Sequence, residues 1–278
     1  MQQQQSSFTN RAGLQIHQQS WAPDGDIKAW LLVVHGMAEH SSRYQPLAEY
    51  LGESGYALCT LDLPGHGKSE GDPGHIDAFA DFLDTLDQTL EQLKALQPDK
   101  PIFLLGHSMG GLISASFLLD HQQDFRGAIL SGAAIQAPGG KPPWIQVFIV
   151  RLLSRFAPGV GVMQLDANGV SRDPEVVAEY RADPLNYPGK ISARGVFELF
   201  SAMDTIQARA SEITLPLLIM HGEADSMTPV EGSRLLHQRA GSADKTLRTY
   251  PGLYHEIFNE PERMEIFAEL RDWLNLHC

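Results

Sequence analysis

The sequence predicts an α/β fold, in which a mostly parallel sheet is flanked by helices and interrupted by an inserted helical cap. Short apolar runs rich in β-branched residues alternate with longer segments of helical periodicity, as in strand–helix–strand units. The chain has 278 residues, enough for a large core domain with an insertion. Because the alternation lapses over residues 136–212, we expect a cap there, with a core formed by residues 1–135 and 213–278.

The individual elements follow from these patterns. The predicted strands cover 14–21, 29–36, 56–63, 101–108, 125–132, 216–225 and 246–252, the first of them a candidate antiparallel strand. The predicted helices cover 44–54, 76–97, 109–121, 229–239 and 264–276; in 76–97 the apolar residues recur at steps of three and four. The N-terminal MQQQQSSFTN lacks the features of a signal peptide, and we expect a short disordered lead-in.

Composition excludes several classes of function. The net charge is −13 and the basic residues are scattered singly, so a nucleic-acid partner is not expected. The most apolar segment, 144–157, is too short to cross a bilayer and contains Arg151 and Arg155. A disulfide between Cys59 and Cys278 is poorly motivated. We therefore expect a soluble, cytoplasmic protein that could contact a membrane peripherally.

Two Gly-x-Ser-x-Gly patterns compete for the role of nucleophile. The first, around Ser69, lies in a loop where Pro73 and Gly74 block a following helix. The second, around Ser108, ends the apolar strand PIFLLG and begins a helix. Only that setting forms a nucleophile elbow, in which flanking glycines leave room for close backbone approach and the helix N-terminus favours negative charge. We predict Ser108 as the nucleophile, rather than a simple N-cap, and Ser69 as a solvated loop residue.

A serine hydroxyl needs a base to take its proton and a carboxylate to orient that base. His255 follows the last predicted strand, and Asp225 lies at the carboxyl end of the strand before it, in the chain order that such an elbow requires. The alternative acid position, after Gly132, holds no carboxylate. Asp62 also ends a strand, but it precedes Ser108 and is better explained by a structural role in its loop.

The oxyanion of the tetrahedral intermediate requires backbone N–H donors. Met109, which follows the nucleophile, supplies one in this prediction, and Met37, in the loop after AWLLVVHG, supplies the other. The sequence contains no zinc, P-loop or paired-cysteine motif. We therefore predict catalysis without a metal or cofactor.

Five motifs in order, HGMAEHSSRY, LDLPGHGKSEG, GHSMGG, HGEAD and GLYHEIFNE, resemble the monoacylglycerol lipase and lysophospholipase branch of the α/β-hydrolases, which shares much of this motif set with serine aminopeptidases. The resemblance implies an eight-stranded sheet and hydrolysis of an ester between a fatty acyl chain and a small polar alcohol. It also implies that Glu39 and Arg43 lie near the polar head-group. Ala38 departs from the family, which often has glycine there.

The predicted cap contains an apolar stripe between Trp144 and Phe156 with arginines beside it. Such a helix either lines an acyl tunnel, touches a membrane or micelle, or packs on the core. The lipid ester that the resemblance implies is the expected substrate, and the stripe is compatible with it; a general carboxylesterase and an aminopeptidase are the enzymatic alternatives. A non-catalytic ligand-binding protein is disfavoured because all three triad residues are present.

Overall fold

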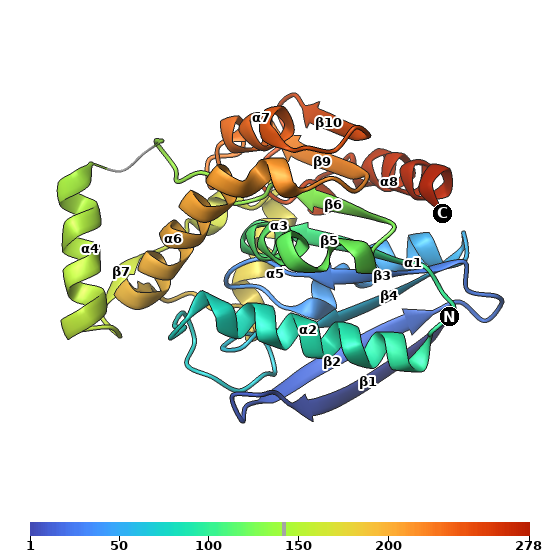
Figure 1. The fold of residues 1–278 in the computed structure, drawn as a ribbon, viewed down its shortest axis with the longest axis horizontal. Coiled ribbons are helices and arrows are strands. Elements are labelled where there is room, and N and C mark those ends of the chain that lie inside the picture. The colour runs from blue at the N-terminus through green and yellow to red at the C-terminus, as the bar shows by residue number, and fades with distance from the viewer. Residues whose placement is uncertain (141–142) are drawn as a thin grey trace.

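The computed structural model describes residues 1–140 and 143–278, and its centre is an eight-stranded sheet (Figure 1). The strand order is β1-β2-β4-β3-β5-β6-β9-β10. Their bounds are β1 Gln2–Thr9, β2 Gln15–Ala22, β3 Ala29–Val34, β4 Tyr56–Leu61, β5 Ile102–His107, β6 Gly127–Ser131, β9 Leu217–Gly222 and β10 Lys245–Tyr250. Only β2 runs against the other strands, so the predicted mostly parallel sheet is confirmed.

The N-terminus differs from its prediction, because residues expected to be disordered form β1. This strand pairs with β2 along its whole length, from Gln2 opposite Ala22 to Thr9 opposite Gln15. Its glutamines are exposed and show no apolar alternation, so no local pattern predicts a strand here. The strand is held by backbone pairing to β2 and by Phe8, which packs against the core.

Helices cover both faces of the sheet and bury two separate apolar clusters. On one face lie α2 (Phe79–Leu96), α3 (Met109–His121) and α7 (Val230–Arg239); on the other lie α1 (Gln45–Gly52) and α8 (Arg263–His277). Successive residues of β3 alternate between the two clusters, Leu31 in one and Leu32 in the other. Coverage on both faces explains why this strand is a continuous apolar run.

The stretch predicted as a cap connects β6 to β9, and its described residues form three α-helices. They are α4 (Trp144–Phe156), α5 (Pro174–Ala182) and α6 (Ala193–Arg209), together with the short paired strands β7 (Gly161–Met163) and β8 (Ile191–Ser192). In Figure 1, α4 stands at the edge of the molecule and packs on α6, which reaches back to α3. Lys141 and Pro142, at the predicted start of the insertion, lie outside the described residues.

None of the helices within the described residues is long and apolar enough to cross a membrane. Cys59 is buried and Cys278 exposed, and both are free thiols.

Candidate active site

The structure places Ser108 in the turn between β5 and α3, with backbone angles φ 54° and ψ −119°. Positive φ is rare for a residue with a side chain and is typical of strained functional positions. The flanking glycines are required by packing, because a Cβ on Gly106 would lie 2.3 Å from the carbonyl oxygen of Gly110. On Gly110 it would lie 2.1 Å from the Val34 carbonyl oxygen. The strand and helix therefore approach closely enough to force the serine outward.

Ser69, in the competing pattern, lies in a loop as predicted, but the expectation that it is solvated was wrong: it is half-buried and its hydroxyl bonds to protein groups. Its hydroxyl donates to the carbonyl oxygen of Asp62 at 2.6 Å and accepts from the backbone N–H of His17 at 2.8 Å. The Asp62 carboxylate in turn accepts from the N–H groups of Ser41 and Lys68, both at 2.8 Å. Ser69 and Asp62 thus fasten the loop that follows β4.

Asp225 and His255 form a buried pair. Nδ1 of His255 lies 2.7 Å from Oδ2 of Asp225, and the two side chains are 3% and 0% exposed. The histidine ring also lies beside the elbow: its centroid is 4.7 Å from that of His107, and a Cβ on Gly132 would lie 3.3 Å from Nδ1. The N–H of Ser108 donates to Ser131, next to Gly132, so the structure brings all three predicted residues to one edge of the sheet.

The Asp225 carboxylate receives further hydrogen bonds that fix its orientation. Its Oδ1 accepts from the N–H groups of Met227 and Thr228 at 2.8 and 2.9 Å. The Thr228 hydroxyl lies 2.8 Å from Oδ2, and Nε2 of the buried His221 lies 3.2 Å from the same oxygen. Both oxygens of the Asp225 carboxylate therefore have hydrogen-bond partners in the protein besides His255.

These contacts shift the ionisation of both groups. Burial acts to raise the pKa of Asp225, but His255 and the hydrogen bonds from His221, His255 and Thr228 hold the pKa well below its ordinary value. Burial acts to lower the pKa of His255, but Asp225, with smaller contributions from Glu256 and Glu39, raises it. Burial and the neighbouring His255 lower the pKa of His107 to about 4, so His107 is neutral near pH 7.

The loop after β3 carries Met37 between Gly36 and Ala38. The backbone N–H of Gly36 donates to Oε1 of Glu39 at 2.6 Å. Within the described residues neither the N–H of Met37 nor that of Met109 has an acceptor in the protein. Ala38 has φ +64°, which explains why glycine is favoured at this position. Its carbonyl oxygen accepts from the Tyr180 hydroxyl at 3.0 Å and the Tyr187 N–H at 3.1 Å.

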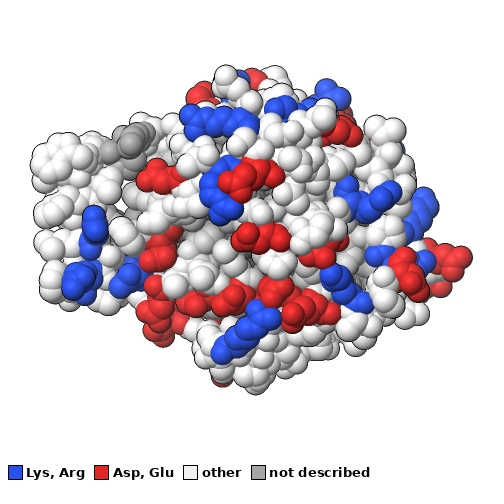
Figure 2. All heavy atoms as spheres, viewed as in Figure 1, with Lys and Arg blue, Asp and Glu red and all other residues white. Residues whose placement is uncertain are grey.

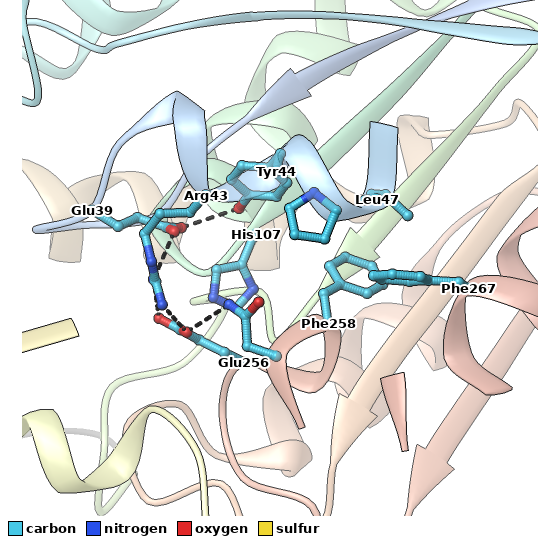
Figure 3. Close-up of a pocket in the computed structure, with 10 residues that line it drawn as sticks. Glu39, Arg43, Tyr44, Leu47, His107, Glu256, Phe258 and Phe267 are labelled. Carbon is cyan, nitrogen blue, oxygen red and sulfur yellow. Dashed lines mark hydrogen bonds and ion pairs between the residues drawn. The ribbon is translucent and has the colours of Figure 1, made fainter. Parts of the chain in front are cut away.

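Glu39 and Arg43 lie in a buried ionic cluster with Glu256 (Figure 3). The guanidinium donates to both oxygens of Glu256 at 2.6 Å and to Glu39 at 3.1 Å. The cavity between these side chains measures about 10 Å³, room for one water molecule at most. A head-group contact of Glu39 and Arg43 stays a prediction; their contacts here are with protein groups.

A much larger cavity, about 700 Å³, lies between the α5 region and the core. It is lined by Ala38, next to Met37, and by Met227, close to Asp225, as well as by Tyr180 and Tyr187. Its size falls within the range of about 300–1,000 Å³ that is usual for small-molecule sites.

Sequence reasoning missed four residues of this region: His221, Thr228, Glu256 and Tyr180. His221 and Glu256 lie inside motifs that were recognised, HGEAD and GLYHEIFNE, and their proximity to Asp225 and His255 was an available signal. Tyr180 lies in α5 and reaches the site only through the tertiary fold, so no local pattern could have identified it.

A serine at a strained strand-to-helix turn, beside a buried histidine–carboxylate pair on a mostly parallel sheet, defines the serine hydrolases of the α/β-hydrolase fold. The model of the hydrolase family described as serine aminopeptidase, S33, matches residues 25–262. The chain belongs to this family, and it is a hydrolase.

Relatives and solved structures agree with the resemblance found in the motifs. A monoacylglycerol lipase of Mycolicibacterium smegmatis is 39% identical over 98% of this chain and 96% of its own length. The crystal structure of a monoacylglycerol lipase of Paleococcus ferrophilus matches with a TM-score of 0.83 and 32% identity, over all of both chains. A soluble variant of the monoglyceride lipase of Saccharomyces cerevisiae, in complex with a substrate analogue, matches with a TM-score of 0.84 and 27% identity, over 99% of this chain and 94% of its own. The predicted resemblance is confirmed.

Proposed function

We propose that this protein hydrolyses esters between a fatty acid and a small polar alcohol, either monoacylglycerols or lysophospholipids, through an acyl-enzyme on Ser108. The observation that carries the proposal is the 2.7 Å contact between His255 and Asp225 beside the strained Ser108 turn. The monoacylglycerol lipases among the relatives support the choice of substrate class.

In acylation, Oγ of Ser108 attacks the ester carbonyl carbon while Nε2 of His255 takes the hydroxyl proton. Asp225 accepts from Nδ1–H, which holds the imidazole in the tautomer whose Nε2 is free to act as base. The oxyanion that forms is bound by the N–H groups of Met37 and Met109, the latter at the N-terminus of α3. The C–O bond to the alcohol then breaks, and His255 gives the proton to the departing oxygen.

In deacylation, water takes the place of the alcohol. His255 removes a proton from the water, which attacks the acyl carbonyl, and the same N–H groups bind the second oxyanion. Collapse releases the fatty acid, and the proton returns to Ser108. The buried carboxylate of Asp225 stabilises the imidazolium in both halves of the reaction.

The exposed face of α4 supports contact with lipid aggregates as part of this function. Only Ser154 of this helix is buried, while Trp144 and Phe156 are 78% and 74% exposed, with Phe148, Ile149 and Leu152 also exposed. Figure 2 shows uncharged and basic side chains at this edge of the molecule. Because the whole chain carries a net charge of −13, we propose that the lipid surface bound by this helix is zwitterionic or neutral.

The two free cysteines support a reducing compartment, and we propose the cytoplasm.

The deciding experiment compares wild-type enzyme with Ser108→Ala on monoacylglycerols of rising chain length, lysophosphatidylcholine and aminoacyl-arylamides. We expect turnover of the lipid esters that rises with chain length and is lost in the variant. A flat profile with efficient arylamide cleavage would instead indicate a peptidase, and unchanged turnover in Ser108→Ala would reject the mechanism.

A further inference from the structure

We propose that Arg43 is a positioning residue: it ties the loop that carries His255 to the loop that carries Met37, and so holds the base and the oxyanion donor in register. This inference rests on the proposed function and deepens it. It assigns to Arg43 and Glu256 a role through other protein groups, rather than through the substrate.

The contacts of Arg43 join segments that are far apart in the chain. Its Nη1 and Nη2 each lie 2.6 Å from one oxygen of Glu256, 213 residues away and directly after His255. The same Nη1 donates to Glu39 at 3.1 Å, and the guanidinium carbon lies 4.9 Å from the ring centroid of Tyr180 in α5. Such a two-point pairing restricts both the distance and the direction of the partner, which a single hydrogen bond does not.

The carboxylates of Glu39 and Glu256 connect Arg43 to the loops that carry Met37 and His255. Glu39 holds the His35–Gly36 peptide, one peptide before the N–H of Met37, because its Oε1 accepts from the Gly36 N–H at 2.6 Å. Glu256 is covalently next to His255, and its own N–H donates to the carbonyl oxygen of Val170 at 2.8 Å. The side chains of Glu39, Arg43 and Glu256 therefore connect the backbone of the Gly36 loop to the loop that carries His255.

The oxygens of the two carboxylates are already occupied by protein donors. Oε1 of Glu39 also accepts from the Tyr44 hydroxyl at 3.1 Å, and Oε2 of Glu256 also accepts from the Asn259 amide at 2.9 Å. The side chains of Glu39, Arg43 and Glu256 are 4%, 12% and 5% exposed. The free space enclosed between the three side chains is about 10 Å³, so the groups of this cluster contact one another rather than a ligand there (Figure 3); the outer side of Arg43 borders a separate cavity of about 380 Å³.

The charge of Arg43 bears on the chemistry as well. His255 lies against Asp225 in the loop after β9 and His107 at the end of β5, and the charges of Glu256 and Glu39 contribute to raising its pKa. The positive charge of Arg43 compensates the carboxylates of Glu39 and Glu256. Without Arg43 their negative charge would favour the protonated form of His255 over the neutral form that acts as base.

The test measures kcat and KM of Arg43→Met, Arg43→Lys and Glu256→Gln on two esters, p-nitrophenyl butyrate, which has no glycerol, and a monoacylglycerol. We expect kcat to fall about 10- to 100-fold on both esters for Arg43→Met, with KM changed by less than about threefold. Arg43→Lys keeps the charge but not the paired geometry, so its kcat should lie between those of the wild type and Arg43→Met. The acid limb of the kcat/KM profile of Arg43→Met should move to higher pH.

Arg209→Met is the matched control, because Arg209 pairs with Glu212 at an exposed site, and its kinetics should equal those of the wild type. If Arg43→Met does not fold, Glu256→Gln tests the proposal instead, because it weakens the pairing with Glu256 but leaves Arg43 paired with Glu39; its kcat should also fall on both esters. A loss confined to KM for the monoacylglycerol would overturn the proposal in favour of head-group binding, and unchanged kinetics in all three variants would also overturn it. Failure of the proposed function itself shows separately, as absent wild-type turnover of the lipid ester.

Discussion

Nδ1 of His255 lies 2.7 Å from Oδ2 of Asp225, and this contact joins residues from two loops at the carboxyl end of the sheet. Together with the buried carboxylates nearby, it raises the pKa of an imidazole that burial alone would lower. The contact determines both the orientation of the base and the pH at which the base is available.

The pH dependence follows directly. His255 must be neutral to accept the Ser108 proton, and because its pKa is raised, activity should fall with decreasing pH around a midpoint above the ordinary histidine value. The measurement is kcat/KM on a soluble ester between pH 4 and 9. In Asp225→Asn, kcat should fall by about 10⁴-fold, since the tautomer is no longer fixed. A wild-type midpoint below that of free histidine would contradict the charge assignment.

The two Gly-x-Ser-x-Gly serines should respond differently to the same substitution. Ser108→Ala removes the nucleophile, and we expect a loss of at least about 10⁴-fold in kcat with an unchanged melting temperature. Ser69→Ala removes two loop hydrogen bonds and should cost about 1–2 kcal/mol of unfolding free energy with kcat retained. A serine-directed covalent probe should label the Ser69→Ala protein and leave Ser108→Ala unlabelled; the reverse pattern would exchange the two assignments.

His221 should support Asp225 through a single donor atom. Its Nε2 faces two acceptors, Oδ2 of Asp225 at 3.2 Å and the carbonyl oxygen of Thr228 at 3.0 Å, so Nε2 carries a proton. His221→Leu keeps the volume but removes the donor, and we expect kcat to fall about tenfold, in line with a hydrogen bond to a charged group. His221→Gln retains an N–H donor and should keep more activity. Equal losses in both variants would show that packing, not the hydrogen bond, matters.

Ala38 offers a test of backbone strain. At φ +64° a side chain costs about 1–2 kcal/mol, while glycine adds about 0.4–1 kcal/mol of unfolded-state entropy. Ala38→Gly should therefore be neutral or stabilising by up to about 1.5 kcal/mol, and the β-branched Ala38→Val should be clearly destabilising. Urea denaturation of both variants measures the difference, and the opposite order of stabilities would be inconsistent with the backbone described here.

The lipid contact of α4 can be followed by fluorescence, because Trp144 is 78% exposed while Trp21, Trp30 and Trp273 are buried. Phosphatidylcholine vesicles should shift the emission of the protein to shorter wavelength, and Trp144→Ala should abolish the shift. Phe148→Glu should weaken vesicle binding at least about tenfold, since burying a phenylalanine contributes about 1.5–3 kcal/mol. Leu276→Glu, at an exposed position near the end of α8, is the control expected to bind normally. Equal binding by Phe148→Glu would place the contact elsewhere.

Much of the fold and the local settings of the site could be predicted because the relevant signals are local. Strands such as β3 and β5 are buried on both faces and form apolar runs; Ser108 follows β5 directly, and Asp225 lies in the loop that follows β9. β1 gave no such signal, since its glutamines acquire structure only by pairing with β2. The pairing of Arg43 with Glu256 spans 213 residues, and no periodicity or spacing connects two such positions.

The carbonyl oxygen of Ala38 is held by Tyr180 and Tyr187, and both donors belong to the segment between β6 and β9. Without the Tyr180 hydroxyl this carbonyl oxygen would keep only one of its two protein donors, and the loop that carries Met37 would lose part of its support. The segment between β6 and β9 therefore does more than line the large cavity: it also fixes the backbone of the loop in which an oxyanion donor is predicted.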